Sequence, residues 1–290
     1  MAAGATGPAG PGKTRIALCQ FEGGKASKAD NIAAMRAAVR EAAEGGAQLA
    51  LLPEMWHCPY SNDAFPGAAE DIDAGSSESV RAMAEAASAS GITVVGGTIS
   101  EARAGGVYNT CCVLGPDGAL LGKYSKTHLF DIDIPGKVTF RESDTLTRGP
   151  GLTVVDTPIG RVGLGICYDL RFPELAMAYA RRGCHLICYP GAFNTTTGPL
   201  HWSLLQRARA VDNQLFVASA CCARDESASY VAYGHSMAVG PFGEVLVEAE
   251  TAPGVFFADL DMGEIATRRS NMPLASQRRG DLYEFVDKTA

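Results

Sequence analysis

The order in which strand-like and helix-like segments follow one another is the strongest constraint on this 290-residue chain. Short apolar runs with the pattern of buried strands alternate with amphipathic stretches, such as the one in which Ile32, Met35 and Val39 recur at helical spacing. This alternation predicts strands connected by helices, and therefore sheets that contain parallel strands. Strands are expected at residues 15–21, 47–53, 92–96, 162–166, 186–190 and 215–220, and helices include residues 77–88, 174–182 and 201–212.

The same order of elements occurs twice along the chain. Each half ends in a hairpin whose turn has the sequence Gly-Pro-x-Gly, at residues 115–118 and 240–243. The repetition predicts two halves related by a pseudo-twofold axis. Because no linker separates them, we expect one domain over residues 13–290, built from two sheets covered by helices. Residues 1–12 are rich in Ala, Gly and Pro and are expected to form a disordered tail.

Composition narrows the class of function. A formal net charge of −7 argues against a nucleic-acid or anionic-membrane surface, and the longest apolar runs have the length of strands, so no transmembrane span is expected. A small-molecule substrate fits this balance better. The nine cysteines are odd in number and lie mostly in apolar runs, which is typical of a reducing compartment. With no apolar signal core at the N-terminus, the predicted location is the cytoplasm.

Two further patterns suggest ligands but are better explained without them. Residues 7–14 match the spelling of a phosphate-binding loop, yet a strand-like run follows them where a helix is required. His57 beside Cys58, and Cys184-His185 with Cys188, resemble parts of a zinc site. Their spacings match no closed tetrahedral site, so packing in the core is preferred and no metal is expected.

The most informative stretch is residues 163–174, where an apolar strand stops at Cys167 and a helix begins a few residues later. A strand-to-helix turn of this kind exposes a nucleophile and directs the following N–H groups beside it. Glu54 stands just past another apolar strand, where partial burial raises the pKa of a carboxyl group. Lys126 follows the second strand of a hairpin, and Glu142 lies in a position to anchor that lysine or orient an amide. A thiol, a carboxylate and a cation are the groups that acyl transfer requires.

These segments resemble the nitrilase (carbon–nitrogen hydrolase) superfamily, whose catalytic triad is Glu-Lys-Cys. The matching motifs are Leu-Leu-Pro-Glu54, Tyr-Ser-Lys126-Thr-His-Leu-Phe and Gly-Ile-Cys167-Tyr-Asp-Leu-Arg-Phe-Pro-Glu, in the family's order. Ser125 departs from the pattern, because arginine is common before the lysine. The resemblance implies an α/β fold, a four-layer α-β-β-α sandwich, and pairing into a homodimer or a higher homo-oligomer.

The resemblance also implies a mechanism. Cys167, its thiolate favoured by Lys126, would attack an amide carbon, and Glu54 would carry the proton to the departing ammonia. Lys126 and the backbone N–H of Tyr168 would hold the oxyanion, with Glu142 in a supporting role. A thioester would remain and then be hydrolysed, and no cofactor is required.

Within the superfamily, residues 191–202, 205–213 and 223–236 resemble the omega-amidase branch. Such enzymes release ammonia from short dicarboxylate monoamides, notably 2-oxoglutaramate and 2-oxosuccinamate. A substrate of this class has a carboxylate, so its pocket should supply a cation or several hydrogen-bond donors. The candidates for substrate binding are Tyr60, Arg171, Phe193, Asn194 and Thr195, with the two threonines that follow. Arg171 has an alternative expectation, an internal ion pair with Asp169 or Glu174.

Two other functions remain open from the sequence. The first is a related amidase, acting on deaminated glutathione or on N-carbamoyl compounds. The second is a catalytically silent binding partner with the same fold. The four groups Glu54, Lys126, Glu142 and Cys167 argue against silence, since a scaffold has no need to retain all of them.

Overall fold

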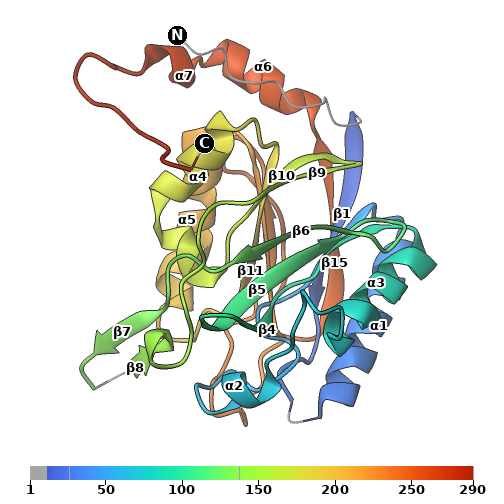
Figure 1. Cartoon of the computed structure of the whole chain (residues 1–290). Helices are drawn as coiled ribbons and strands as arrows, with labels where there is room; N and C mark the ends of the chain where they lie inside the picture. The colour runs from blue at the N-terminus through green and yellow to red at the C-terminus, as the bar shows by residue number, and fades with distance from the viewer. Residues whose placement is uncertain (1–11, 26, 137, 290) are drawn as a thin grey trace.

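The computed structural model describes residues 12–25, 27–136 and 138–289 of the chain. Two sheets lie face to face, with helices on their outer faces (Figure 1). The first sheet consists of β1 (Lys13–Gln20), β2 (Leu49–Leu51), β3 (Thr93–Val95), β4 (Ile99–Arg103), β5 (Gly106–Leu114), β6 (Leu120–Ser125) and β15 (Gly254–Asp261). The second consists of β9 (Val154–Thr157), β10 (Gly160–Leu164), β11 (Leu186–Gly191), β12 (Phe216–Cys221), β13 (Met237–Val239) and β14 (Val245–Glu248).

Two pairs of helices complete the layers. Helices α1 (Lys28–Glu44) and α3 (Glu78–Ser90) cover the first sheet, while α4 (Pro173–Arg181) and α5 (Gly198–Asn213) cover the second (Figure 1). The other helices are α2 (Ala64–Ala68), α6 (Gly263–Asn271) and α7 (Leu274–Gln277), and two 3₁₀ turns are η1 (Glu142–Asp144) and η2 (Cys167–Arg171). The expected α-β-β-α sandwich is therefore confirmed.

The two halves share one strand topology. Strand order is β15-β1-β2-β3-β5-β4 in the first sheet, with β6 beside β5, and β9-β10-β11-β12-β13-β14 in the second, written from the matching end. In each sheet the three central strands are parallel, and an antiparallel strand flanks them on both sides. The predicted repetition of the element order is thus visible as a repeated topology.

The alternation of side chains along β1 explains how the layers hold together. Ile16 and Leu18 belong to the core that joins the two sheets, whereas Ala17 and Cys19 pack with Met35 beneath α1. Successive side chains of a strand point to opposite faces, so a strand buried on both faces must be apolar throughout. This is the reason the central strands of both sheets appear in the sequence as continuous apolar runs.

Several elements differ from the expectation. The hairpin of β7 (Asp131–Ile134) and β8 (Val138–Arg141), and the sheet-edge strands β4, β9 and β15, are not predicted by hydrophobic pattern. Helix α5 begins at Gly198 rather than at residue 201, because Pro199 lies in its first turn, where proline needs no hydrogen-bonded N–H. The predicted tail lies outside the described residues except for Gly12. Lys13 and Thr14, the end of the phosphate-loop spelling, are the first residues of β1.

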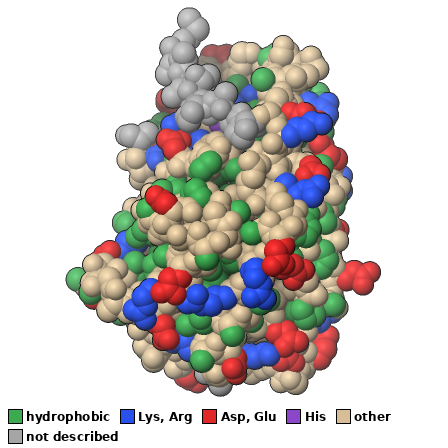
Figure 2. All heavy atoms as spheres, turned by 90° about the vertical axis from the view of Figure 1, so that its right-hand side faces the viewer, with side chains coloured by type: hydrophobic (Ala, Val, Ile, Leu, Met, Phe, Trp, Pro, Cys, Tyr) green, Lys and Arg blue, Asp and Glu red, His purple; other side chains and the backbone are tan. Residues whose placement is uncertain are grey.

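Charges of both signs are mixed on the surface. Figure 2 shows the face where α1 and α3 lie, on which basic and acidic side chains are interspersed, as in the ion pair of Arg36 with Glu85. In the part of the chain that the structure describes, no helix is both long enough and apolar enough to cross a membrane.

The buried imidazole of His57 predicts sensitivity to acid. Burial lowers the pKa of His57 from 6.5 to about 4. Between these values the unfolded chain binds a proton that the folded chain does not, so the free energy of unfolding falls as pH falls, by about 3 kcal/mol over the whole window. Thermal unfolding followed from pH 7 to pH 4 measures this. In His57→Gln the amide oxygen can replace the ring Nε2 as acceptor for the Ser100 N–H. The dependence of stability on pH should be weaker in this variant, and an unchanged dependence would contradict the assignment to His57.

Candidate active site

The four groups singled out from the sequence come from the ends of different strands. Glu54 follows β2, Lys126 follows β6, Cys167 follows β10, and Glu142 opens η1 after the β7–β8 hairpin. In open α/β sheets, residues beyond the carboxyl ends of the strands form the usual ligand site. The fold therefore brings distant segments of the sequence to one rim.

Lys126 joins two carboxylates in the interior. Its Nζ lies 2.9 Å from Glu54 Oε1 and 2.9 Å from Glu142 Oε1. All three side chains are at most 1% exposed. Asn109, on β5, donates a further hydrogen bond of 2.8 Å to Glu54 Oε1. Burying charges is costly unless partners compensate them, so this cluster has a purpose beyond packing.

Glu142 organises the other side of Lys126. Besides the lysine, its Oε1 accepts a hydrogen bond of 2.7 Å from the hydroxyl of Tyr60, and its Oε2 accepts one of 2.7 Å from the backbone N–H of Phe130. Tyr60, expected to bind substrate, is therefore engaged with the carboxylate. Glu142 both positions Lys126 and satisfies buried donors.

A Glu142→Ala variant is expected to lose stability as well as activity. Three buried donors would lose their acceptor, and Lys126 would retain one carboxylate, so we expect a loss of about 3 kcal/mol or more in the free energy of unfolding. Denaturant titration measures it. Glu142→Gln, which retains an acceptor oxygen, should lose less stability, and equal stability of Glu142→Ala and the unmodified chain would contradict this role.

Cys167 lies on a strained turn. Its φ is +46°, in the left-handed region that residues other than glycine rarely adopt. It begins η2 after β10, from which Gly165 and Ile166 separate it, as the nucleophile of a sharp strand-to-helix turn does. Tyr168 is the next residue of this turn, where the first N–H groups have no acceptor inside the helix. Strain of this kind persists where the surrounding structure holds it in place.

Asp169 holds that turn against the lysine segment. Its Oδ2 accepts hydrogen bonds from the Ile166 N–H at 2.8 Å and the Tyr124 hydroxyl at 2.7 Å, and its Oδ1 accepts one from the His128 N–H at 3.0 Å. The carboxylate is fully buried. Asp169 thus fixes the distance between the segment that contains Lys126 and the turn that presents Cys167.

Burial dominates the electrostatics at the cysteine. Burial, and next the negative charge of Glu54, raise the pKa of Cys167 well above 9.0, although Lys126 lowers it. Lys126 thus favours the thiolate, as expected, but desolvation outweighs the lysine and keeps the thiol protonated. Burial raises the pKa of Glu54, as predicted. Burial alone would lower the pKa of Lys126, but the charges of Glu142 and Glu54 raise it well above 10.5, so the lysine stays charged.

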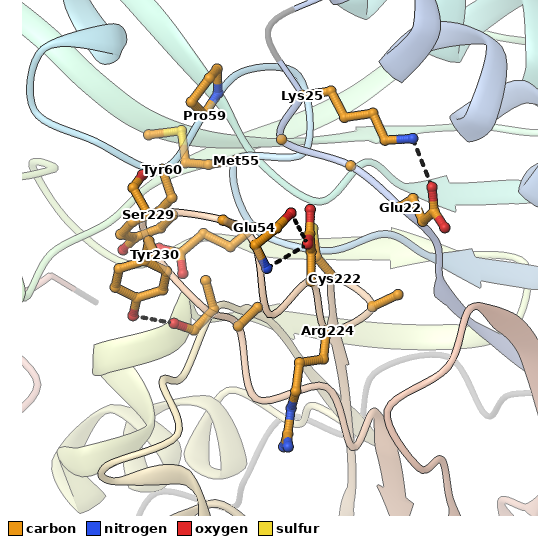
Figure 3. A pocket seen from close by; sticks show the side chains of 18 of the residues that line it. Glu22, Lys25, Glu54, Met55, Pro59, Tyr60, Cys222, Arg224, Ser229 and Tyr230 are labelled. Carbon is orange, nitrogen blue, oxygen red and sulfur yellow. Dashed lines mark hydrogen bonds and ion pairs between the residues drawn. The ribbon is translucent and has the colours of Figure 1, made fainter.

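Two cavities adjoin this cluster. We call the larger one, of about 560 Å³, the large cavity; its lining includes Glu54, Tyr60 and Tyr230. In Figure 3 these three side chains lie at one end, and Glu22 and Lys25 at the other. We call the smaller one, of about 10 Å³, the cysteine pocket, because Cys167 lines it. A space of that size has room for about one water molecule.

The cysteine pocket contains two of the predicted substrate residues. Arg171 and Phe193 line it together with Thr197. The Arg171 guanidinium lies 4.8 Å from the centre of the Phe193 ring and donates to His201 Nδ1 at 3.0 Å. Its expected ion pair with Asp169 or Glu174 is wrong: no carboxylate among the described residues pairs with it, and Asp169 is occupied by the lysine segment.

Two other predicted substrate residues lie elsewhere. Asn194 Oδ1 accepts hydrogen bonds from the backbone of Thr196 and Thr197, so its side chain shapes the turn before α5. Thr195 is exposed and lines neither cavity. Their proximity in sequence to Phe193 suggested a common site, but the tight turn directs successive side chains apart.

Sequence reasoning missed Asn109, Asp169 and Tyr230. Asn109 is a polar residue in the otherwise apolar run of β5, a signal that a buried partner exists. Asp169 follows Cys167 by two residues, and that closeness was the only sign of its role. Tyr230 lies in an irregular loop without periodic pattern, so no local signal identifies it.

The cysteines and histidines that resembled a zinc site do not converge. Cys184 and Cys188 lie in the hydrophobic core, and His57 Nε2 accepts a hydrogen bond from the Ser100 N–H. Within residues 12–25, 27–136 and 138–289, no three His, Cys, Asp or Glu side chains form a cluster able to hold a metal ion. Each of the nine cysteines is a free thiol.

This arrangement has the parts of covalent acyl transfer. A thiol lies beside a carboxylate whose Oε2 has no hydrogen-bond partner among the described residues, and a buried ammonium is held next to both. Such a carboxylate can accept a proton, and the ammonium can stabilise an oxyanion.

Comparison with known proteins agrees with this interpretation of the site as one for acyl transfer. The model of the carbon-nitrogen hydrolase family matches residues 15–270. The chain is 56% identical to an Arabidopsis thaliana protein named omega-amidase, chloroplastic, over 95% of this chain and 75% of the relative. It is 52% identical to human omega-amidase NIT2, over 93% and 96% of the two chains. The crystal structure of Saccharomyces cerevisiae Nit3, a member of branch 10 of the nitrilase superfamily, matches with a TM-score of 0.86 and 39% identity, over 95% and 100%.

Proposed function

Because this chain belongs to the carbon–nitrogen hydrolase family, we propose that it is an omega-amidase acting on short dicarboxylate monoamides such as 2-oxoglutaramate and 2-oxosuccinamate. It hydrolyses the terminal amide to the dicarboxylate and ammonia. The observation that supports this most directly is the buried cluster of Lys126, Glu54 and Glu142 beside Cys167. A second support is Arg171 in the cysteine pocket, a cation that no carboxylate of the described residues neutralises.

In the first half of the reaction, Cys167 Sγ attacks the amide carbon while Glu54 accepts the thiol proton. Because the resting thiol is protonated, proton transfer accompanies attack. Lys126 Nζ and the Tyr168 N–H hold the oxyanion of the tetrahedral intermediate. When the C–N bond breaks, Glu54 returns the proton to the nitrogen, which leaves as ammonia.

The second half uses the same groups. Glu54 takes a proton from water, whose oxygen attacks the thioester carbon, and the C–S bond breaks. The proton then passes to the cysteine sulfur, which restores the thiol. Throughout, Arg171 pairs with the substrate carboxylate and so fixes which end of the molecule meets Cys167.

A substrate panel tests this function. We expect kcat/KM for 2-oxoglutaramate to exceed that for an uncharged amide of the same length by at least about tenfold, since Arg171 would otherwise be desolvated without a partner. Ammonia release measures both. Turnover restricted to deaminated glutathione or to N-carbamoyl compounds would move the assignment to a related amidase, and no turnover of any amide would leave a silent binding partner.

We also propose a homodimer in the cytoplasm. Helix α5 presents Leu200 and Leu204, which are 65% and 62% exposed, on one outer face of the sandwich, a face suited to a second copy of the chain. The free thiols support a reducing location. Sedimentation analysis should give twice the chain mass, and Leu204→Glu should shift it towards the monomer.

A further inference from the structure

Tyr230 forms the boundary between the large cavity and the cysteine pocket. Among the described residues, Ala192 and Tyr230 are the two that line both spaces. These two residues are also joined directly, because the Tyr230 hydroxyl donates a hydrogen bond of 2.5 Å to the Ala192 carbonyl oxygen. The dashed line beside Tyr230 in Figure 3 marks this bond. The phenol is therefore a shared wall between the large cavity and the pocket that Cys167 lines.

The ring is held by the charged cluster itself. Tyr230 stacks on Tyr60, with ring centroids 4.4 Å apart and planes at 27°. Tyr60 is in turn anchored by its hydrogen bond to Glu142 Oε1. Phe140 packs edge-to-face with Tyr230, with ring centroids 6.1 Å apart. Aromatic packing and one hydrogen bond thus hold the Tyr230 ring in place, while the backbone of Tyr230 belongs to an irregular loop.

The position of Tyr230 matters because the two spaces that it separates differ greatly in volume. The space beside Cys167 is about 10 Å³, against about 560 Å³ on the other side of the ring. Arg171 lines the cysteine pocket and not the large cavity, so an acyl group whose carboxylate pairs with Arg171 must make room within the smaller space, of which Tyr230 forms one wall. Each added methylene presses more bulk against that ring. We propose that Tyr230 is a specificity-determining residue, whose ring limits the length and bulk of the amides that reach Cys167.

This inference rests on the proposed amidase function for its kinetic test. In Tyr230→Ala the two spaces join, so the ratio of kcat/KM for a monoamide one methylene longer than 2-oxoglutaramate to that for 2-oxoglutaramate should rise about tenfold or more. Tyr230→Phe retains the ring and should keep the ratio within about threefold. Ser229→Ala, which changes a neighbouring side chain that lines the large cavity and not the cysteine pocket, should leave the ratio unchanged.

A second measurement needs no amidase activity. The rate of alkylation of Cys167 is followed by mass spectrometry of its peptide, with iodoacetamide and with a bulky N-aryl iodoacetamide. In Tyr230→Ala the rate of alkylation by the bulky reagent should increase at least about tenfold more than the rate with iodoacetamide. Tyr230→Leu serves if the alanine variant does not fold. Unaltered ratios in both measurements, or equal changes in Ser229→Ala, would overturn the inference. Absence of turnover with a shifted alkylation ratio would instead overturn the amidase function alone.

Discussion

A Cys167→Ala variant is expected to release ammonia from 2-oxoglutaramate at least about 10⁴-fold more slowly than the unmodified chain. No other thiol can substitute, because Cys167 alone among the nine lines the pocket that contains Arg171. The fold should be retained, since alanine removes one sulfur atom from a turn held by Asp169. A steady-state ammonia assay with a detection limit below that residual rate measures the effect.

The matched control is Cys188→Ala, which removes a fully buried thiol from β11 in the core. It should lose stability and retain turnover. Residual turnover of Cys167→Ala within a hundredfold of the unmodified chain would show that another group forms the covalent bond, or that none is formed. Rapid acid quench of the unmodified enzyme, with mass spectrometry of the peptide that contains Cys167, should detect the thioester directly.

Glu54→Gln is the second variant with a large expected effect, a loss in kcat/KM of about 10³-fold. Glutamine retains the shape and can still accept the hydrogen bond from Asn109, but it cannot accept a proton. Because burial raises the pKa of Glu54, the carboxylate needed for attack forms at higher pH than an exposed glutamate would require. In the unmodified enzyme, kcat/KM should therefore rise with pH through that raised pKa, and in the variant this limb should disappear.

Glu101→Gln is the matched control, because it distinguishes a loss of catalysis from the general effect of neutralising a buried carboxylate. Glu101, on β4, is also fully buried and ion-paired, with Lys123 Nζ at 2.6 Å, but it lies outside both cavities. Its loss should lower the free energy of unfolding while turnover persists. A Glu54→Gln variant that retains the acidic limb of the pH profile would assign that limb to a different group and remove Glu54 from the role of base.

The central strands and the four charged or nucleophilic groups could be predicted because each depends on local pattern. A strand buried on both faces must be apolar, and a polar side chain immediately after it, such as Glu54, marks the rim. The edge strands could not be predicted in this way. β15 is only partly buried over residues 254–257 and depends on β1 for its hydrogen bonds, and no described residue of β7 or β8 is fully buried.

The partners of the polar groups were beyond the reach of sequence pattern. Arg171 stands near Asp169 and Glu174 along the chain, yet Asp169 is taken by Tyr124 and His128 from another segment. The protonated state of the Cys167 thiol could not be predicted from the sequence for a related reason. The sequence motif indicates that a cation lies near the thiol. The cost of desolvating the thiolate depends on how completely the fold excludes water, and that is a property of the whole sandwich.

The pairing of β1 with β15 has a consequence for how the chain folds during synthesis. Lys13 pairs with Asp261 and Gln20 with Gly254, so β1 can complete its hydrogen bonds on this side only after a much later segment of the chain has been translated. Until then one edge of β1 offers unpaired peptide groups to any other extended chain. A nascent or truncated protein that lacks β15 should consequently depend on chaperones, and ribosome-released fragments that end before residue 254 should aggregate where the full chain does not.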